Sequence, residues 1–353
     1  MEEPTSKKIA LTSGSIPTTT PLVSETAKTH TKPKTKKQVI CISRRTDVPS
    51  NETMLDKVLA GFVSGTITYD FPRFVRNPGP IKQTKPVSLR PEDVEMVSWW
   101  SKDFANLLAK WDTFAEVLSK YHHHFTFTIN GPEKSALEPG LKSTLAARFE
   151  QLALLVRLCK EVLNQDPAVS ITVHVDPISV YRLPKSANPA EEHHTLGHIE
   201  ALCNTMRALG LTKIHMSFTQ FGWPSVRKYL NDIRGDIDIL DPNITQCKML
   251  LATHFFPYTK GLEIETCTAI VFVAAQDADM PQHIRKGACV GRNTVIAVTG
   301  NKSIPDIVRK PVGKSTANCT CFPFKDIGSA KEECSNSCRY CFMNSKKLPI
   351  PTF

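Results

Sequence analysis

The cysteines near the C-terminus are the residues whose type and spacing most clearly indicate chemistry. Cys334, Cys338 and Cys341 are separated by three and by two residues, and Cys319 and Cys321 lie shortly before them. Three thiolates at these spacings can bind one face of a 4Fe-4S cluster and leave one iron without a protein ligand. We therefore predict an iron-sulphur site in this segment, with an open iron at which a cofactor or substrate can react.

Zinc is the alternative metal, because thiolates bind zinc as readily as iron. Structural zinc sites typically use two separate pairs of cysteines, whereas this triplet is compact and has Tyr340 before its last member, which favours iron. Cys319 and Cys321 point the same way on an extended segment. They could supply a fourth ligand, hold a second metal, form a redox pair or simply pack.

The sequence also predicts the strands and helices that would position such a site. Short runs rich in β-branched and aromatic residues alternate with stretches of helical spacing, which is typical of βα units around a parallel sheet. We expect six strands, at residues 39–43, 95–100, 125–130, 170–175, 213–218 and 262–266. Helices are expected at residues 51–63, 103–119, 143–163, 195–209 and 242–251, and a loop or hairpin at residues 65–90, which contain four prolines. The predicted fold class is α/β, with the βα units arranged either as a barrel or as a doubly wound sheet.

Polar residues follow each predicted strand, where ligands bind in parallel α/β folds. An anionic substrate would suit Arg44 and Arg45, which can hold a carboxylate or phosphate through bidentate bonds. The candidate catalytic residues at these ends are Asp47, Lys102, Asn130, Asp176 and Glu265. The structural alternative is that such residues are helix caps or ordinary polar loop residues.

The segment from Cys334 to Phe342 resembles the cluster loop of radical S-adenosylmethionine enzymes, whose fold is a six-stranded partial βα barrel. This resemblance implies that the α/β fold is a partial (βα)6 TIM-like barrel with a C-terminal cysteine-rich cluster loop. It also implies a 4Fe-4S cluster, S-adenosylmethionine bound at the open iron, and an electron donor that allows the cofactor to form a radical. Residues from about 38 to 344 also resemble the DUF1848 family. The matching segments are 42–49 (ISRRTDVP), 75–78 (VRNP), 87–94, 127–131, 176–178, 217–218, 265–267 and 326–328, together with the terminal cysteines.

Length and composition indicate the size of the core, the domain organisation and the cellular location. The chain has 353 residues and is 41% hydrophobic, enough for a large core. We divide it into a disordered Thr/Ser/Lys-rich leader (1–37), a barrel-like domain (38–310) and a cysteine-rich segment packed on that domain (311–353). Eleven cysteines and no membrane-length apolar run indicate a reducing, cytoplasmic location, with organellar import left open.

The net charge of +10 resides mainly at the two ends of the chain. The competing functions are a zinc-stabilised βα-barrel protein, and a nucleic-acid-associated protein of the repair type whose basic ends grip phosphates.

Overall fold

The computed structural model describes residues 37–44, 46–71, 83–131, 136–219, 221, 224–266, 284–307, 320–328 and 334–341. These described residues belong to one compact unit. The expected leader lies outside the described residues except for Lys37, and the expected cysteine-rich segment is described only at residues 320–328 and 334–341.

An eight-stranded sheet forms the centre of the molecule, and all of its neighbouring strands pair in parallel. In chain order its strands are β1 (Gln38–Ile42), β4 (Val94–Ser101), β5 (His123–Thr128), β6 (Ile171–Ile178), β9 (Lys213–Phe218), β11 (Glu263–Thr266), β12 (Ile284–Lys286) and β13 (Phe324–Asp326). Their order across the sheet is β12-β11-β9-β6-β5-β4-β1-β13.

The first six of these strands confirm the predicted ones. The prediction was wrong in the number of strands, because β12 and β13 add one strand at each edge. The fold is an α/β fold with a large parallel sheet, and the two edge strands do not pair with each other within the described part of the chain.

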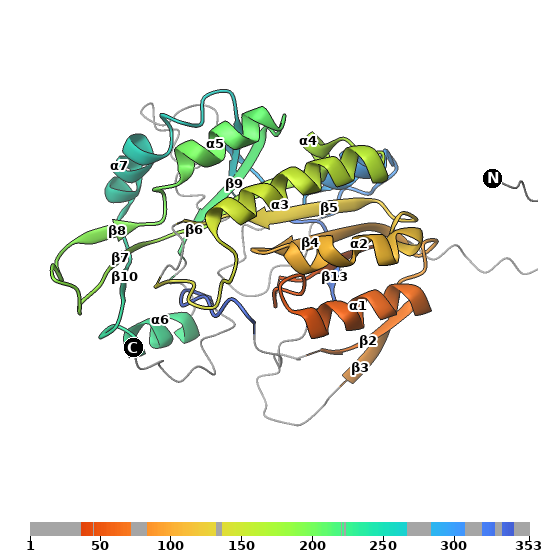
Figure 1. The fold of residues 1–353 in the computed structure, drawn as a ribbon, viewed down its shortest axis with the longest axis horizontal. Coiled ribbons are helices and arrows are strands. Elements are labelled where there is room, and N and C mark those ends of the chain that lie inside the picture. The colour runs from red at the N-terminus through yellow and green to blue at the C-terminus, as the bar shows by residue number, and fades with distance from the viewer. Residues whose placement is uncertain are drawn as a thin grey trace, which may run out of the picture. The chain divides into compact units, whose positions relative to one another are not determined.

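Helices cover the apolar face of the sheet. The principal ones are α1 (Glu52–Ser64), α2 (Ala105–Leu118), α3 (Leu145–Arg157) and α5 (Ile199–Ala208), and Figure 1 shows α1, α2 and α3 side by side along the sheet. The chain enters α1 at Asn51, whose side chain accepts a hydrogen bond from the N–H of Met54, and leaves it at Gly65 with φ of 74°. Trp99, Phe125 and Phe127 point to this side and are fully buried in the core.

The remaining helices and sheets are shorter. The helical segments are η1 (Leu158–Val162), α4 (Pro167–Ser170), α6 (Pro224–Asp232), α7 (Ile244–His254) and α9 (Arg292–Thr299). Strands β2 (Thr66–Phe71) and β3 (Gln83–Ser88) form an antiparallel hairpin, which confirms the hairpin alternative for residues 65–90. A small antiparallel sheet consists of β10 (Asp238–Leu240), β7 (Val180–Arg182) and β8 (Glu192–His194). None of the described helices has the length and apolar character that a membrane crossing requires.

The second face of the large sheet carries polar side chains. Because side chains alternate between faces along a strand, the residues between the core positions share this surface. We call it the polar face; its members include Cys41, Ser98, Trp100, His124, Thr172, His174, Asp176, His215 and Ser217. Most of these side chains are buried, and Asp176 and Ser217 stand toward the carboxyl ends of their strands.

Candidate functional site

Residues 334–341, which we call the cysteine loop, dock on the segments that follow the parallel strands. The N–H of Arg339 donates to the carbonyl of Leu137 at 2.8 Å, and the N–H of Gly140 donates to the carbonyl of Asn336 at 3.2 Å. A Cβ atom on Gly140 would lie 2.0 Å from the carbonyl oxygen of Ser335, so the two backbones approach as closely as glycine permits. The loop therefore contacts the segment that follows β5.

Asp47 joins the loop to two strands. Its carboxylate accepts hydrogen bonds from the hydroxyl of Ser101 at 2.5 Å, the N–H of Lys102 at 2.7 Å and the side-chain amide of Asn336 at 2.6 Å. Burial raises the pKa of Asp47, although these hydrogen bonds act to lower it. Because its oxygens are so fully engaged, Asp47 is suited to hold the loop in place.

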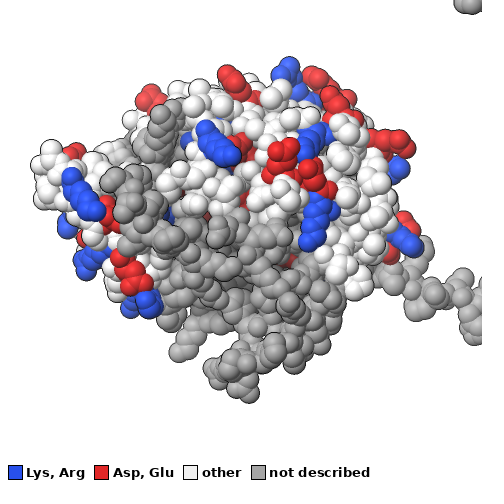
Figure 2. All heavy atoms as spheres, turned by 60° about the horizontal axis from the view of Figure 1, so that its bottom comes forward, with Lys and Arg blue, Asp and Glu red and all other residues white. Residues whose placement is uncertain are grey.

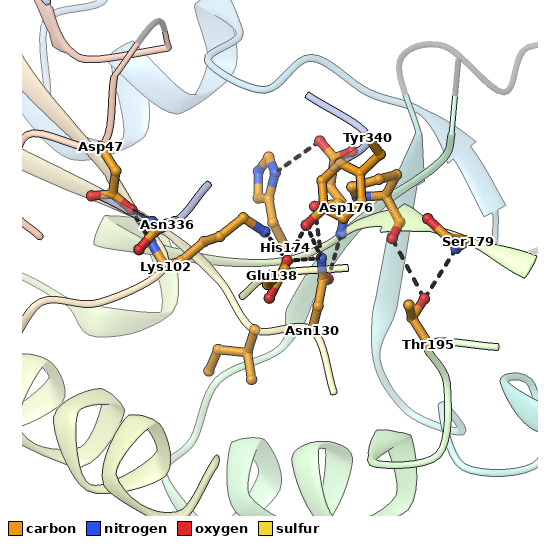
Figure 3. Close-up of polar contacts among 12 residues, drawn as sticks. Asp47, Lys102, Asn130, Glu138, His174, Asp176, Ser179, Thr195, Asn336 and Tyr340 are labelled. Carbon is orange, nitrogen blue, oxygen red and sulfur yellow. Dashed lines mark hydrogen bonds and ion pairs between the residues drawn. The ribbon is translucent and has the colours of Figure 1, made fainter. Parts of the chain in front are cut away.

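A second carboxylate, Glu138, binds the Tyr340 end of the cysteine loop. Lys102 donates to it at 2.8 Å and Asn130 at 3.1 Å, and the hydroxyl of Tyr340 donates to the same oxygen. Figure 3 shows these side chains converging from the segments that follow β4 and β5 and from the cysteine loop. Burial acts to raise the pKa of Glu138, but the charge of Lys102 outweighs it and the pKa is lowered. The Glu138–Lys102 pair is therefore ionised under the loop.

Asn130 connects this network to Asp176. Its amide donates to the carbonyl of Asp176 at 3.1 Å and accepts from the N–H of Asp176 at 3.1 Å, while also donating to Tyr340 at 3.1 Å. The Asp176 carboxylate accepts a hydrogen bond from Ser217 and lies 3.9 Å from the ring of His174. Burial acts to raise the pKa of Asp176, but His174 and Ser217 outweigh it and keep the pKa below its usual range.

The thiols of the loop differ in their surroundings. Burial, together with the nearby Asp47, raises the pKa of Cys334 to about 11. Burial also raises the pKa of Cys338 well above that of an unperturbed thiol, against the opposing effect of Lys102. Cys341 interacts electrostatically with both, so the three thiols are neighbours.

The three thiols of the cysteine loop are suitable ligands for an iron-sulphur cluster, but they are not placed closely enough to share one metal ion. Among the described residues, no three His, Cys, Asp or Glu side chains are placed closely enough to share a metal ion. Three neighbouring thiols fit an iron-sulphur cluster chemically, because thiolates are the usual ligands of such clusters and each thiol loses its proton on ligation. Binding would require the sulphurs to move toward one another.

The other predicted site residues lie apart from this network. Glu265 pairs with Lys213 at 3.4 Å on the polar face. The guanidinium of Arg44 lies 5.2 Å from the ring centre of Trp100 and 5.7 Å from that of Phe324.

Cys321 is also separate, because it is buried beside Cys289 in a different cluster from Cys338. Arg45 and Cys319 lie outside the described residues.

The structure therefore unites Asp47, Lys102, Asn130 and Asp176 with the cysteine loop. Sequence reasoning missed Glu138 and Asn336, which complete the network. The signal for Glu138 was weak, because an acid in a Pro-rich loop is normally exposed and its burial depends on Lys102, distant in the sequence.

Comparison with known proteins places the chain in a family. No curated protein and no solved structure shows significant similarity to it. The model of the family described as "Domain of unknown function (DUF1848)" matches residues 39–343, which include the sheet, the carboxylate network and the cysteine loop. The chain therefore belongs to the DUF1848 family.

Proposed function

We propose that this protein binds a 4Fe-4S cluster through Cys334, Cys338 and Cys341 and acts as a radical S-adenosylmethionine-type enzyme. The observation that carries the proposal is the docking of the cysteine loop on the strand ends by Asn336 and Tyr340. Catalytic sites of parallel βα folds lie at this end of the sheet. A cluster held there would lie beside the strand ends at which a substrate is expected to bind.

The strand order supports a barrel-like arrangement. Seven strands from β1 to β12 follow one another in chain order across the sheet, and the last strand, β13, pairs with β1 on the other side. The segments next to the two edge strands also meet, since the N–H of Phe322 donates to the carbonyl of Val290 at 2.8 Å. This is the order expected of a βα barrel opened between β12 and β13.

The chain's own residues have three tasks in this proposal. Asp47 and Glu138 anchor the loop, and the ammonium of Lys102 favours a negative thiolate at Cys338. Cys338 is buried in an apolar cluster, which limits the access of water to its thiol; the cluster also contains Leu137, Tyr181, Tyr229 and Leu230. When bound, the cluster and S-adenosylmethionine would supply a 5′-deoxyadenosyl radical for hydrogen abstraction.

Anaerobic reconstitution with iron and sulphide tests the proposal. We expect about four iron and four sulphide ions per chain, and release of 5′-deoxyadenosine when S-adenosylmethionine and a strong reductant are added. The Cys338→Ser variant should lose the cluster, whereas Cys247→Ser, which alters a buried cysteine of α7, should keep it. One zinc ion per chain and no iron would overturn the assignment in favour of the zinc-stabilised alternative.

The described part of the face drawn in Figure 2 gives no particular support to the nucleic-acid alternative. Figure 2 shows Lys and Arg interspersed with Asp and Glu over the described part of one face. Duplex binding uses a concentration of positive charge on one surface. We therefore propose a small anionic molecule as the substrate class, with Arg44 as a residue that could receive it.

A further inference from the structure

His174 occupies an unusual position in the middle of β6. It is fully buried on the polar face, and neither of its ring nitrogens has a hydrogen-bond partner among the described residues. A buried polar group without a partner costs about 1–3 kcal/mol. Such a cost is commonly retained at a position where a ligand or a reacting group completes the hydrogen bonds.

An oriented carboxylate lies next to this ring. The Nδ1 atom of His174 is 3.9 Å from the Oδ2 atom of Asp176, longer than a hydrogen bond, and Figure 3 shows the ring facing that carboxylate. Ser217 and Asn130 fix Asp176 through its carboxylate and its backbone. Hydrogen bonds of catalytic groups are often long before a substrate binds. The Asp176 side chain is 34% exposed, so the pair can be approached from the strand ends.

Burial and the groups around His174 keep its ring uncharged at neutral pH. Its ring stacks on His215 at 4.6 Å and meets the edge of Trp100 at 5.5 Å, on which Arg44 also lies. Burial lowers the pKa of His174 to about 4; His215 and Arg44 act in the same direction, and Asp176 opposes them. His124, on the neighbouring strand β5, also interacts with it electrostatically.

We propose that His174 is an acid–base residue for an anionic substrate bound on the polar face, with Asp176 and Ser217 as positioning residues. Asp176 accepts the Nδ1 hydrogen, and the Nε2 lone pair takes a proton from an O–H or N–H group of the substrate. The electron pair of that broken bond stays on the substrate, and the same proton later returns to the product. No electron is transferred, so this inference goes beyond the cluster proposal and stands without it.

Arg44 is the residue that favours an anionic ligand near His174. Its guanidinium can bind a carboxylate or a phosphate, and both it and His174 contact the Trp100 ring. An anion bound there would stabilise protonated His174. The two sources of negative charge are distinguished by using acetate and inorganic phosphate as separate probes.

Nitrogen-15 NMR of the full chain, labelled at histidine, tests the proposal. We expect His174, assigned with a His174→Gln variant, to carry hydrogen on Nδ1 and none on Nε2 at pH 7. Acetate or phosphate should raise the pKa of His174 by about half a unit or more. The exposed His122 serves as the internal reference and should not respond.

Two variants distinguish a positioning role of Asp176 from a general effect on the stability of the protein. Asp176→Asn should change the proton distribution on the His174 ring, whereas Asp166→Asn, at the exposed cap of α4, should leave it unchanged. A response to only one anion identifies the substrate group. Hydrogen on Nε2 in the wild-type protein, or no response of His174 to either anion, overturns the proposal even if the Asp176 variant does not fold.

Discussion

Adding a single methyl group at Gly140 should displace the cysteine loop. The Cβ atom of Gly140→Ala would lie 2.0 Å from the carbonyl oxygen of Ser335 and 2.9 Å from the carbonyl carbon of Asn336. Both atoms belong to the backbone, so no side-chain rotation can relieve the overlap. The loop must move away or the residues around Gly140 must shift.

The expected magnitude follows from the size of this overlap. Inserting a methyl group into a well-packed site costs about 1–3 kcal/mol. For a chain of this length we expect a fall of the melting temperature by about 2 °C per kcal/mol, or about 2–6 °C. The hydrogen bond between Gly140 and Asn336 would also be lost, which loosens the residues before Cys338.

Thermal unfolding and thiol labelling measure these effects together. The Cys338 thiol, buried in the wild-type protein, should react faster with an alkylating reagent in Gly140→Ala, as detected by mass spectrometry of the labelled peptide. Gly197→Ala is the matched control, because a Cβ atom there has no neighbour within 4 Å. Equal melting temperatures and equal Cys338 labelling for Gly140→Ala and wild type would refute the close contact between Gly140 and the cysteine loop.

Two further substitutions examine the carboxylates beneath the loop. Asn336→Ala removes one donor to Asp47 and should lower the free energy of unfolding by about 1–3 kcal/mol in denaturant titrations; no change would mean that the amide does not hold the loop. Lys102→Met leaves Glu138 buried without its cation and should cost about 3–5 kcal/mol. Adding Glu138→Gln to that variant should recover part of the loss, and strict additivity in this double-mutant cycle would show that the pair is not coupled.

The sequence predicted the parts of the fold that depend on local pattern. Strands β1, β4, β5, β6, β9 and β11 were found because buried parallel strands are apolar and β-branched over several residues. Strands β12 and β13 have only three residues each and contain Arg285, Lys286, Lys325 and Asp326. Their assignment comes from pairing with β11 and β1, which no local pattern encodes.

The candidate site was partly predictable for a similar reason. Asp47, Lys102 and Asn130 lie shortly after the ends of β1, β4 and β5, and topology alone brings such residues together. Glu265 belongs to β11 itself, paired in register with His215, and its side chain therefore lies on the polar face beside Lys213. The docking of the cysteine loop depends on Gly140 and Glu138, whose contacts arise only in the folded chain.

The two carboxylates that hold the loop should respond to pH in opposite ways. The pKa of Glu138 is lowered by Lys102 against the effect of burial, so its contribution to stability is present above the unfolded pKa and is lost as the pH falls through the folded value. The pKa of Asp47 is raised by burial, so its contribution is present below the unfolded pKa and is lost as the pH rises through the folded value.

Acid should therefore release the loop from the Tyr340 end, where Glu138 lies, before the Asn336 end. The destabilisation caused by Glu138→Gln at pH 7 should become smaller between about pH 5 and pH 3. Over this interval the wild-type carboxylate becomes protonated and no longer forms an ion pair with Lys102. The destabilisation caused by Asp47→Asn should not shrink over this interval. Denaturant titrations of both variants and wild type at several pH values measure the difference, and parallel pH profiles for the two variants would contradict the assignment of an ionised Glu138–Lys102 pair beneath Tyr340.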